Sequence, residues 1–182
     1  MTDADQFEAF VREYQDMVYA TAVRLLGSPA EAEDVSQTVF LRAFERFAEV
    51  GRSPSAPGWL KTVTTNACLN HLSRYRARWR LFSEMGRQGP GEGDDRTFED
   101  TLADTGSVAD DMERAESHAQ LEEALRALPD HQRVPLVLFH FEGRSYQEIA
   151  DTLGASLGKV KTDIHRGREV LRQQLGDDHE SR

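Results

Sequence analysis

Hydrophobic side chains recur at steps of three and four residues along the first part of the chain. Over residues 7–25 they mark one face of a helix of about six turns, which Gly27 can end. Ser28 and Pro29 then predict the start of a second helix, in which Glu31 would complete a capping box. The positions of this second helix expected to face inward are Val35, Val39, Ala43, Phe44 and Phe47.

A loop and a third helix are predicted next. Residues 51–58 are rich in Gly and Pro, which is typical of a loop. The hydrophobic periodicity begins again near Trp59 and continues through residues 72–82. Its inward positions are Leu60, Val63, Ala67 and His71. Three long helices of this kind can bury a small shared core.

The pattern changes in the middle of the chain. Residues 83–110 contain five glycines and no clear hydrophobic period, which predicts a flexible linker. Helical periodicity resumes near Asp111, and no segment alternates as a strand would. The sequence therefore predicts an all-α protein of two small helical domains, residues 1–82 and 111–182, joined by an acidic linker.

A helix-turn-helix is predicted near the C-terminus. Ser145 and Glu148 form a capping box at the start of its first helix. Gly154 ends that helix and permits a sharp turn, and Ser156 caps the second helix. The second helix would carry Lys159, Lys161, Thr162, His165, Arg166 and Arg168 on its exposed or flanking faces. Such side chains suit contacts to DNA phosphates and base edges, although an ordinary helical hairpin with a solvated charged face would have the same pattern.

A second candidate for nucleic-acid contact ends the third predicted helix. Residues 74–82 carry Arg at positions 74, 76, 78 and 80, among aromatic residues. Arg neutralises phosphates, and aromatic rings stack on unpaired bases. Asn66 and Asn70, one helical turn apart, can hydrogen-bond the edge of an unpaired base. The alternative is a basic helix end that complements the helix dipole, with Trp79 packed on the domain.

The charge distribution removes an objection to DNA binding. The formal net charge of the chain is −10, but residues 88–123 hold 12 acidic and 2 basic residues and so carry the whole excess. The segments on either side have balanced charges. The acidic character is thus a property of the central segment and not of the predicted domains.

Other features narrow the class of protein. The lone cysteine, Cys68, excludes a disulfide framework and favours a reducing cytoplasm. No hydrophobic run reaches the ~18 residues of a membrane span, so no membrane insertion is expected. The sequence has no metal-ligand cluster, phosphate-binding glycine loop or nucleophile constellation. We therefore expect neither an enzyme nor a bound metal or cofactor.

Two segments of the chain resemble extracytoplasmic-function (ECF) sigma factors, compact members of the sigma-70 superfamily. Region 2 of that family is similar to "YQDMVYATAVRLLGSPAEAEDVSQTVFLRAFERF" and "PGWLKTVTTNACLNHLSRYR". Region 4 is similar to "LEEALRALPDHQRVPLVLFHFEGRSYQEIADTLGASLGKVKTDIHRGREVL". The order of these segments and the intervening linker also fit the family.

The resemblance implies binding of core RNA polymerase and promoter DNA, and an anti-sigma factor as a further partner. Core polymerase would contact Asp34, Gln37, Phe40 and Leu41. The minus-ten promoter element would contact Asn66, Asn70, Arg74 and Arg76. The minus-thirty-five element would contact Ser156, Lys159, Lys161, Thr162, Asp163, His165, Arg166 and Arg168. The competing hypothesis is a stand-alone helix-turn-helix regulator whose first domain is a sensor or a dimerisation unit.

Three residues depart from the pattern of this family. Asp163 stands where a basic residue is usual, and in the major groove its carboxylate could accept a hydrogen bond from cytosine. We therefore expect Asp163 to alter the preferred upstream element. Thr38 replaces an acidic residue in the polymerase-binding motif, and Asn70 replaces an aspartate in the minus-ten motif.

Overall fold

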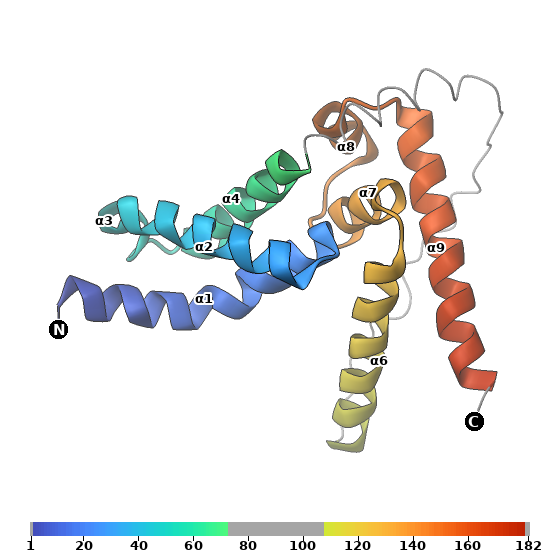
Figure 1. Cartoon of the computed structure of the whole chain (residues 1–182), viewed down its shortest axis with the longest axis horizontal. Helices are drawn as coiled ribbons and strands as arrows, with labels where there is room; N and C mark the ends of the chain where they lie inside the picture. The colour runs from blue at the N-terminus through green and yellow to red at the C-terminus, as the bar shows by residue number, and fades with distance from the viewer. Residues whose placement is uncertain (1, 73–107, 181–182) are drawn as a thin grey trace. The chain divides into compact units, whose positions relative to one another are not determined.

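The computed structural model describes residues 2–72 and 108–180, with side chains over residues 2–72 and 116–176. Most of the predicted linker lies outside the described residues, as do Arg74 and Arg76. The chain divides into two compact units, residues 1–78 and residues 79–182 (Figure 1). Every regular element in the described ranges is a helix, which confirms the predicted fold class.

Three long helices and one short helix form the first unit. They are α1 (Asp3–Leu26), α2 (Pro29–Glu45), α3 (Phe47–Val50) and α4 (Ala56–His71). The helix α1 packs against both α2 and α4, and α2 also packs against α4. Fully buried side chains from all three long helices fill the space between them, among them Val18, Leu25, Val39, Leu60 and Leu69. This arrangement leaves one face of α2 and one face of α4 outside the core.

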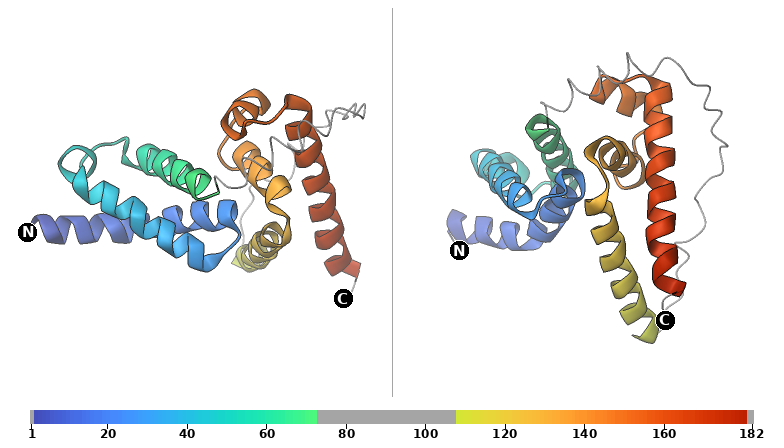
Figure 2. Two further views of the ribbon diagram at one scale, coloured as in Figure 1. Left: turned by 45° about the horizontal axis from the view of Figure 1, so that its top comes forward. Right: turned by 45° about the vertical axis from the view of Figure 1, so that its right-hand side comes forward.

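Four helices form the second unit. They are α6 (Val108–Ala127), α7 (Asp130–His140), α8 (Tyr146–Leu153) and α9 (Leu157–Glu180). The helix α9 packs against each of the other three, and α6 runs alongside it (Figure 2). Core side chains come from every helix and include Leu125, Val134, Leu138, Ile149 and Ile164. The pair α8 and α9 is the predicted helix-turn-helix.

The helix ends follow the predicted capping residues closely. Gly27 and Gly154 both have positive φ, at 68° and 64°, and end α1 and α8 in the left-handed conformation that favours glycine. At the start of α8, Ser145 Oγ accepts from the Glu148 N–H at 3.2 Å, and a Glu148 carboxylate oxygen accepts from the Ser145 N–H at 2.9 Å. Ser156 Oγ accepts from the Lys159 N–H at 3.2 Å and caps α9. Local hydrogen bonding therefore fixes these boundaries.

Two predicted details of α2 are wrong. The Ser28 hydroxyl caps the helix as expected, but the reciprocal half of the capping box does not form. A Glu31 carboxylate oxygen lies instead 3.2 Å from His71 Nε2 on α4, because α4 packs beside the first turn of α2. The helix also ends at Glu45, so Phe47 begins the separate short helix α3.

A close approach of α7 and α9 brings the helix-turn-helix onto the rest of the unit. A Cβ added at Gly167 would lie 2.9 Å from Leu136 Cδ1, which is closer than side chains tolerate. Gly167 is buried and Leu136 is 2% exposed. The absence of a side chain at Gly167 therefore allows the two helices to cross at short distance.

Candidate binding surfaces

The exposed face of α2 carries the residues predicted to bind polymerase. Asp34, Gln37 and Leu41 are exposed, and Phe40 is half-buried at the edge of the same face. Steps of three and four residues place the three exposed side chains on one stripe of the helix. The stripe lies opposite Val35, Val39 and Ala43, which are buried against α1 and α4. Leu41 is 66% exposed and supplies a hydrophobic centre between polar neighbours.

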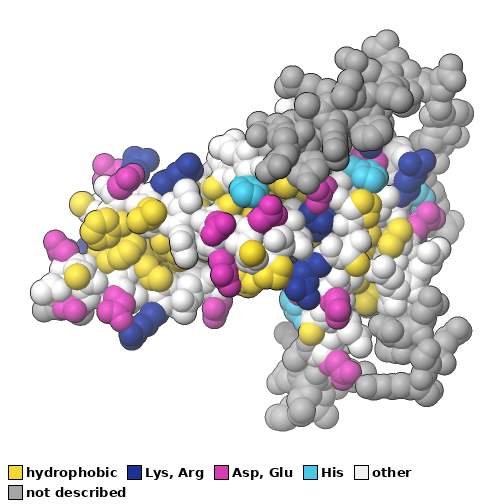
Figure 3. Space-filling model, viewed as in Figure 1, with side chains coloured by type: hydrophobic (Ala, Val, Ile, Leu, Met, Phe, Trp, Pro, Cys, Tyr) yellow, Lys and Arg dark blue, Asp and Glu magenta, His cyan; other side chains and the backbone are white. Residues whose placement is uncertain are grey.

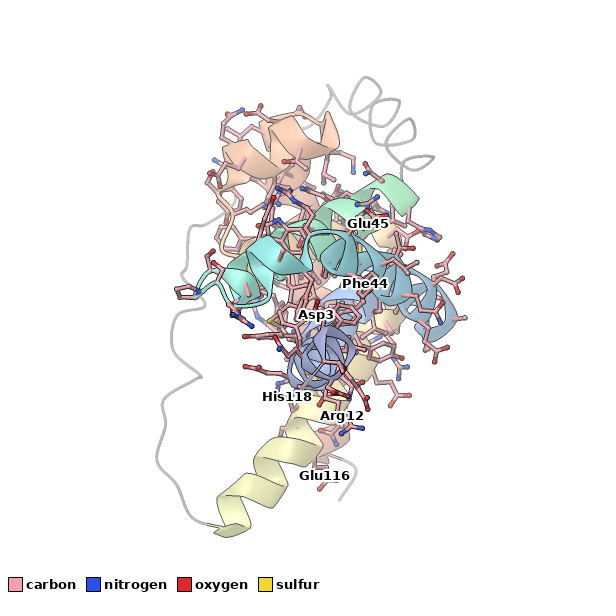
Figure 4. The ribbon with its side chains drawn as sticks, turned by 90° about the vertical axis from the view of Figure 1, so that its left-hand side faces the viewer. Asp3, Arg12, Phe44, Glu45, Glu116 and His118 are labelled. Carbon is pink, nitrogen blue, oxygen red and sulfur yellow. The ribbon has the colours of Figure 1, made fainter. Side chains whose placement is uncertain are left out.

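Phe44 belongs to this stripe and not to the core, which corrects the prediction that it faces inward. Its side chain is 58% exposed, whereas its neighbour Ala43 is fully buried. One edge of the ring is held by Phe7 of α1, with ring centroids 4.9 Å apart and planes at 71°. Phe44 projects from α2 beside Glu45 (Figure 4), and hydrophobic side chains gather on the surface at this end of the unit (Figure 3). We call the exposed residues Asp34, Gln37, Leu41 and Phe44 the α2 stripe.

Asn66 and Asn70 lie one turn apart on the exposed face of α4, as the sequence predicts. Ala67 and Cys68 face the core on the opposite side. The two amide groups are therefore presented together to solvent, where they can reach a base edge. Arg74 and Arg76, predicted to continue this surface, lie outside the described residues.

The helix α9 presents several of the predicted DNA-contacting residues to solvent. Ser156, Lys161, His165 and Arg166 are exposed, and Thr162 and Arg168 are half-buried. His165 Nε2 lies 3.5 Å from a carboxylate oxygen of Glu169, one turn further along. The exposed set spans about three turns of the helix, a length that suits the major groove.

Asp163 does not lie on that exposed set, and its predicted contact with a base is wrong. The residue is 2% exposed and packs between α9 and α7. Its carboxylate accepts a hydrogen bond from Lys159 Nζ one turn earlier, and the Lys159 side chain is itself only 16% exposed. Burial raises the pKa of Asp163 above its ordinary value, while Lys159 opposes that rise. Asp163 therefore serves the packing of the unit, and Lys159 is bound to it.

A cluster of rings joins α7, α8 and α9, which the sequence pattern does not predict. The Phe139 and Tyr146 rings stack with centroids 4.6 Å apart and planes at 5°. Lys161 Nζ lies 5.7 Å from the centroid of the Tyr146 ring, and the Arg168 guanidinium carbon lies 5.5 Å from that of Phe139. Nothing in helical periodicity signals this cluster, because its members come from three different helices.

His140 ends α7 beside this cluster. Arg168 Nε donates a hydrogen bond to His140 Nε2 at 3.0 Å. Partial burial of the ring, together with the positive charge of Arg168, lowers the pKa of His140 to about 4. The imidazole is therefore neutral near pH 7, which is the form that can accept this hydrogen bond.

Within residues 2–72 and 108–180, no group of three or more His, Cys, Asp or Glu side chains is placed to hold a metal ion. None of the helices in these ranges is both long enough and hydrophobic enough to cross a membrane.

Two family models match the chain in the order of its two units. Residues 10–78 match sigma-70 region 2, and residues 118–171 match sigma-70 region 4. The first match contains the α2 stripe together with Asn66 and Asn70. The second contains α7, α8 and the exposed set of α9.

Individual proteins are similar over nearly the whole chain. The ECF RNA polymerase sigma factor SigW of Bacillus subtilis is 31% identical, over 96% of this chain and 91% of that protein. SigE of Mycolicibacterium smegmatis, also an ECF RNA polymerase sigma factor, is 37% identical over 93% of this chain, which spans 61% of that protein. The sigma factor RpoE of Bartonella quintana, solved in complex with the anti-sigma factor NepR, is 22% identical over 93% of this chain with a TM-score of 0.48.

Proposed function

The chain belongs to the sigma-70 family, in its extracytoplasmic-function group, and we propose that it is a promoter-specificity subunit of bacterial RNA polymerase. It binds core polymerase and directs initiation at promoters that carry its minus-ten and minus-thirty-five elements. The observation that carries this proposal is the presence of regions 2 and 4 in one chain and in that order. Sigma factors are not enzymes, and we propose no catalysis by this chain alone.

The α2 stripe is the proposed contact with core polymerase. Leu41 and Phe44 together offer an exposed hydrophobic surface on a rigid helix, and Asp34 and Gln37 offer polar groups on the same face. Interfaces of this composition, with a hydrophobic centre and a polar rim, suit a specific protein partner. The half-buried Phe40 would add to the edge of the contact.

Asn66 and Asn70 are the proposed readers of the minus-ten element. Their amides can donate to and accept from an unpaired base, and α4 holds them one turn apart. Arg74 and Arg76 follow in the chain and would neutralise adjoining phosphates.

The exposed set of α9 is the proposed reader of the minus-thirty-five element. Lys161, His165 and Arg166 can reach phosphates or base edges in the major groove, and the half-buried Thr162 lies beside them. Asp163 is withdrawn from this role because it is buried and bound to Lys159.

Such a subunit needs only a modest affinity for each of the two promoter elements. Core polymerase would hold the two units so that both promoter elements are bound together, and the second contact then forms at high effective concentration. Because a subunit of RNA polymerase works where polymerase does, we propose that the chain acts in the cytoplasm. An anti-sigma factor is a further proposed partner and would act by covering these same surfaces.

The comparisons do not favour the alternative of a stand-alone helix-turn-helix regulator. It would account for α8 and α9, but it gives no role to the α2 stripe or to the match with region 2. A regulator of that kind binds duplex DNA tightly without polymerase, commonly as a dimer on a two-fold site.

The test is reconstitution with core RNA polymerase, followed by run-off transcription on a library of genomic fragments. We expect the chain to form a stable complex with core and to start transcripts at a defined set of promoters. Failure to associate with core, together with tight binding of duplex DNA by the free chain, would favour the stand-alone regulator instead.

A further inference from the structure

Phe139 and Tyr146 form a rigid pair of rings at the junction of three helices. Phe139 lies near the end of α7, and Tyr146 is the first residue of α8. Their rings are almost parallel at 5°, with centroids 4.6 Å apart. Both side chains are half-buried, so the pair is held by the domain and still reaches its surface. We call Phe139 and Tyr146 the ring pair.

Each ring of the pair carries one cation from α9. Lys161 Nζ lies 5.7 Å from the Tyr146 centroid, and the Arg168 guanidinium carbon lies 5.5 Å from the Phe139 centroid. Both distances fall within the ~6 Å at which a cation is attracted to the face of a ring. Lys161 and Arg168 are seven residues apart, about 10 Å along the helix axis. The two rings therefore contact side chains that lie two turns apart on α9.

Arg168 is fixed at a second point. Its Nε donates to His140 Nε2 at 3.0 Å, and His140 lies next to Phe139 in the chain. The guanidinium is therefore held through Nε at His140 and lies over the Phe139 ring. Lys161 is exposed and Arg168 is half-buried, so both can still reach a DNA backbone.

We propose that Phe139 and Tyr146 are positioning residues for promoter binding, which hold the Lys161 ammonium and the Arg168 guanidinium in place for contact with DNA phosphates. This inference rests on the proposed function of α9. The ring pair itself makes no contact with DNA in this role. It acts on affinity through the two cations.

The physical reason is the conformational entropy of long side chains. Free Lys and Arg side chains sample many rotamers, and ordering them on a phosphate opposes binding. A side chain already held near its bound position loses less freedom, which strengthens binding without a new contact. A phosphate contact also displaces counterions from DNA, so the number of such contacts is measurable from salt dependence.

The experiment uses the full chain in complex with core polymerase and a promoter duplex recovered in the transcription test above. The binding constant is measured over a range of salt concentrations for the wild type, Tyr146→Leu and Phe139→Leu. We expect either substitution to weaken binding several-fold. The slope of log K against log salt should become less negative by up to about 0.9 in each variant, since each ring supports one cation and one lost phosphate contact contributes about 0.9.

Two controls separate positioning from simple destabilisation. Tyr146→Phe retains the ring and should retain the wild-type affinity and slope. Ile149→Val trims a fully buried side chain elsewhere on α8, so it lowers stability without touching the ring pair and should leave the slope unchanged. Thermal unfolding of each variant shows how far its fold is affected.

A double-mutant cycle provides the sharpest outcome. Lys161→Ala should cost much less affinity in the Tyr146→Leu background than in the wild type, because the lysine has already lost its support. Additive losses, or wild-type salt slopes in both Leu variants, would overturn the proposal while the wild-type complex still binds its promoter. If the wild-type complex binds no promoter duplex at all, the proposed function fails, and the positioning role fails with it.

Discussion

Lys159 and Asp163, one turn apart on α9, form an ion pair in which the side chains are 16% and 3% exposed. Asp163 packs where α9 meets α7, near His131 and Arg166, and the positive charge of Arg166 also favours its ionised form. A carboxylate in this position depends on its partner, because an unpaired buried charge is costly.

Removal of Lys159 should therefore destabilise the second unit more than removal of a surface lysine. We expect Lys159→Ala to lower the free energy of unfolding at pH 7 by about 3 kcal/mol. The loss should shrink as the pH falls, because the raised pKa of Asp163 lets the folded protein take up a proton before the unfolded chain does. Urea unfolding at several pH values measures both effects. The control is Lys159→Met combined with Asp163→Leu, which removes both charges and should be close to neutral; an equally large loss in that double variant would contradict the ion-pair explanation.

Gly167 and Gly176 provide a matched pair of glycines on α9. A Cβ at Gly167 would meet Leu136 at 2.9 Å, whereas one at Gly176 has no neighbour within 4 Å. Gly167→Ala should therefore destabilise the protein by about 1 kcal/mol or more through overpacking. Gly176→Ala should instead stabilise it by up to about 1 kcal/mol, since alanine is the better helix former. Thermal unfolding gives the change in stability for each variant. If both variants were stabilised, the close packing of Gly167 against Leu136 would not limit the side chain at that position.

Thr64 and Thr65 are adjacent buried residues of α4 with different hydrogen bonding. The Thr64 hydroxyl donates to the Leu60 carbonyl at 2.7 Å. The Thr65 Oγ1 atom is buried and has no hydrogen-bond partner among the described residues. Thr65→Val should raise the free energy of unfolding by about 1 kcal/mol, because it removes a polar group that lost its water on folding. Thr64→Val should bring no such gain. A loss of stability in Thr65→Val would indicate that its hydroxyl does have a partner in solution.

Phe44 and Leu41 should matter for core polymerase and little for folding. Exposed hydrophobic side chains at the centre of an interface commonly contribute more than 1 kcal/mol to binding, so each alanine substitution should weaken core binding about tenfold. A competition assay with labelled wild-type chain measures this. Tyr19→Ala is the control, since Tyr19 is an exposed aromatic residue on α1 outside the α2 stripe. Wild-type core binding by Phe44→Ala would exclude Phe44 from the interface.

His140 should make the second unit sensitive to acid. Its pKa is about 4 in the folded protein and 6.5 for a free histidine. A lowered folded pKa gives stability that is complete above pH 6.5 and is lost as the pH falls towards 4. The melting temperature should fall over this interval, and His140→Gln should remove part of the fall. Burial lowers the pKa of His131 as well, so His131 should contribute to the part of the fall that remains in His140→Gln. A His140→Gln melting curve that follows the wild type at every pH would show that burial and the charge of Arg168 do not hold His140 neutral.

Much of the architecture could be predicted because it depends on local interactions. The Ser145–Glu148 capping box and the left-handed turn at Gly154 involve residues close together in the sequence, and these predictions are confirmed. The common exposure of Asn66 and Asn70 follows from helical geometry, which places residues four apart on the same side.

The wrong predictions concern side chains whose position depends on a neighbouring helix. Phe44 is hydrophobic and was assigned to the core, but Ala43 already fills the buried face of α2 against its neighbours. Asp163 is charged, and the resemblance predicts a DNA contact for it, but the residue is buried and Lys159 neutralises it. In both cases residue type alone was a poor guide, because burial is set by what packs against the helix.

The sequence by itself determined the helices, their caps, the division into two domains and the family. These features depend on contacts within a few residues of the chain or on motifs of fixed spacing. Only the tertiary structure decided which individual side chains depart from the periodic pattern, such as Phe44 and Asp163, and so which cations are available to DNA. The ring pair shows the reason: Phe139, Tyr146 and the two cations lie on three helices, and no periodicity within one helix can place them together.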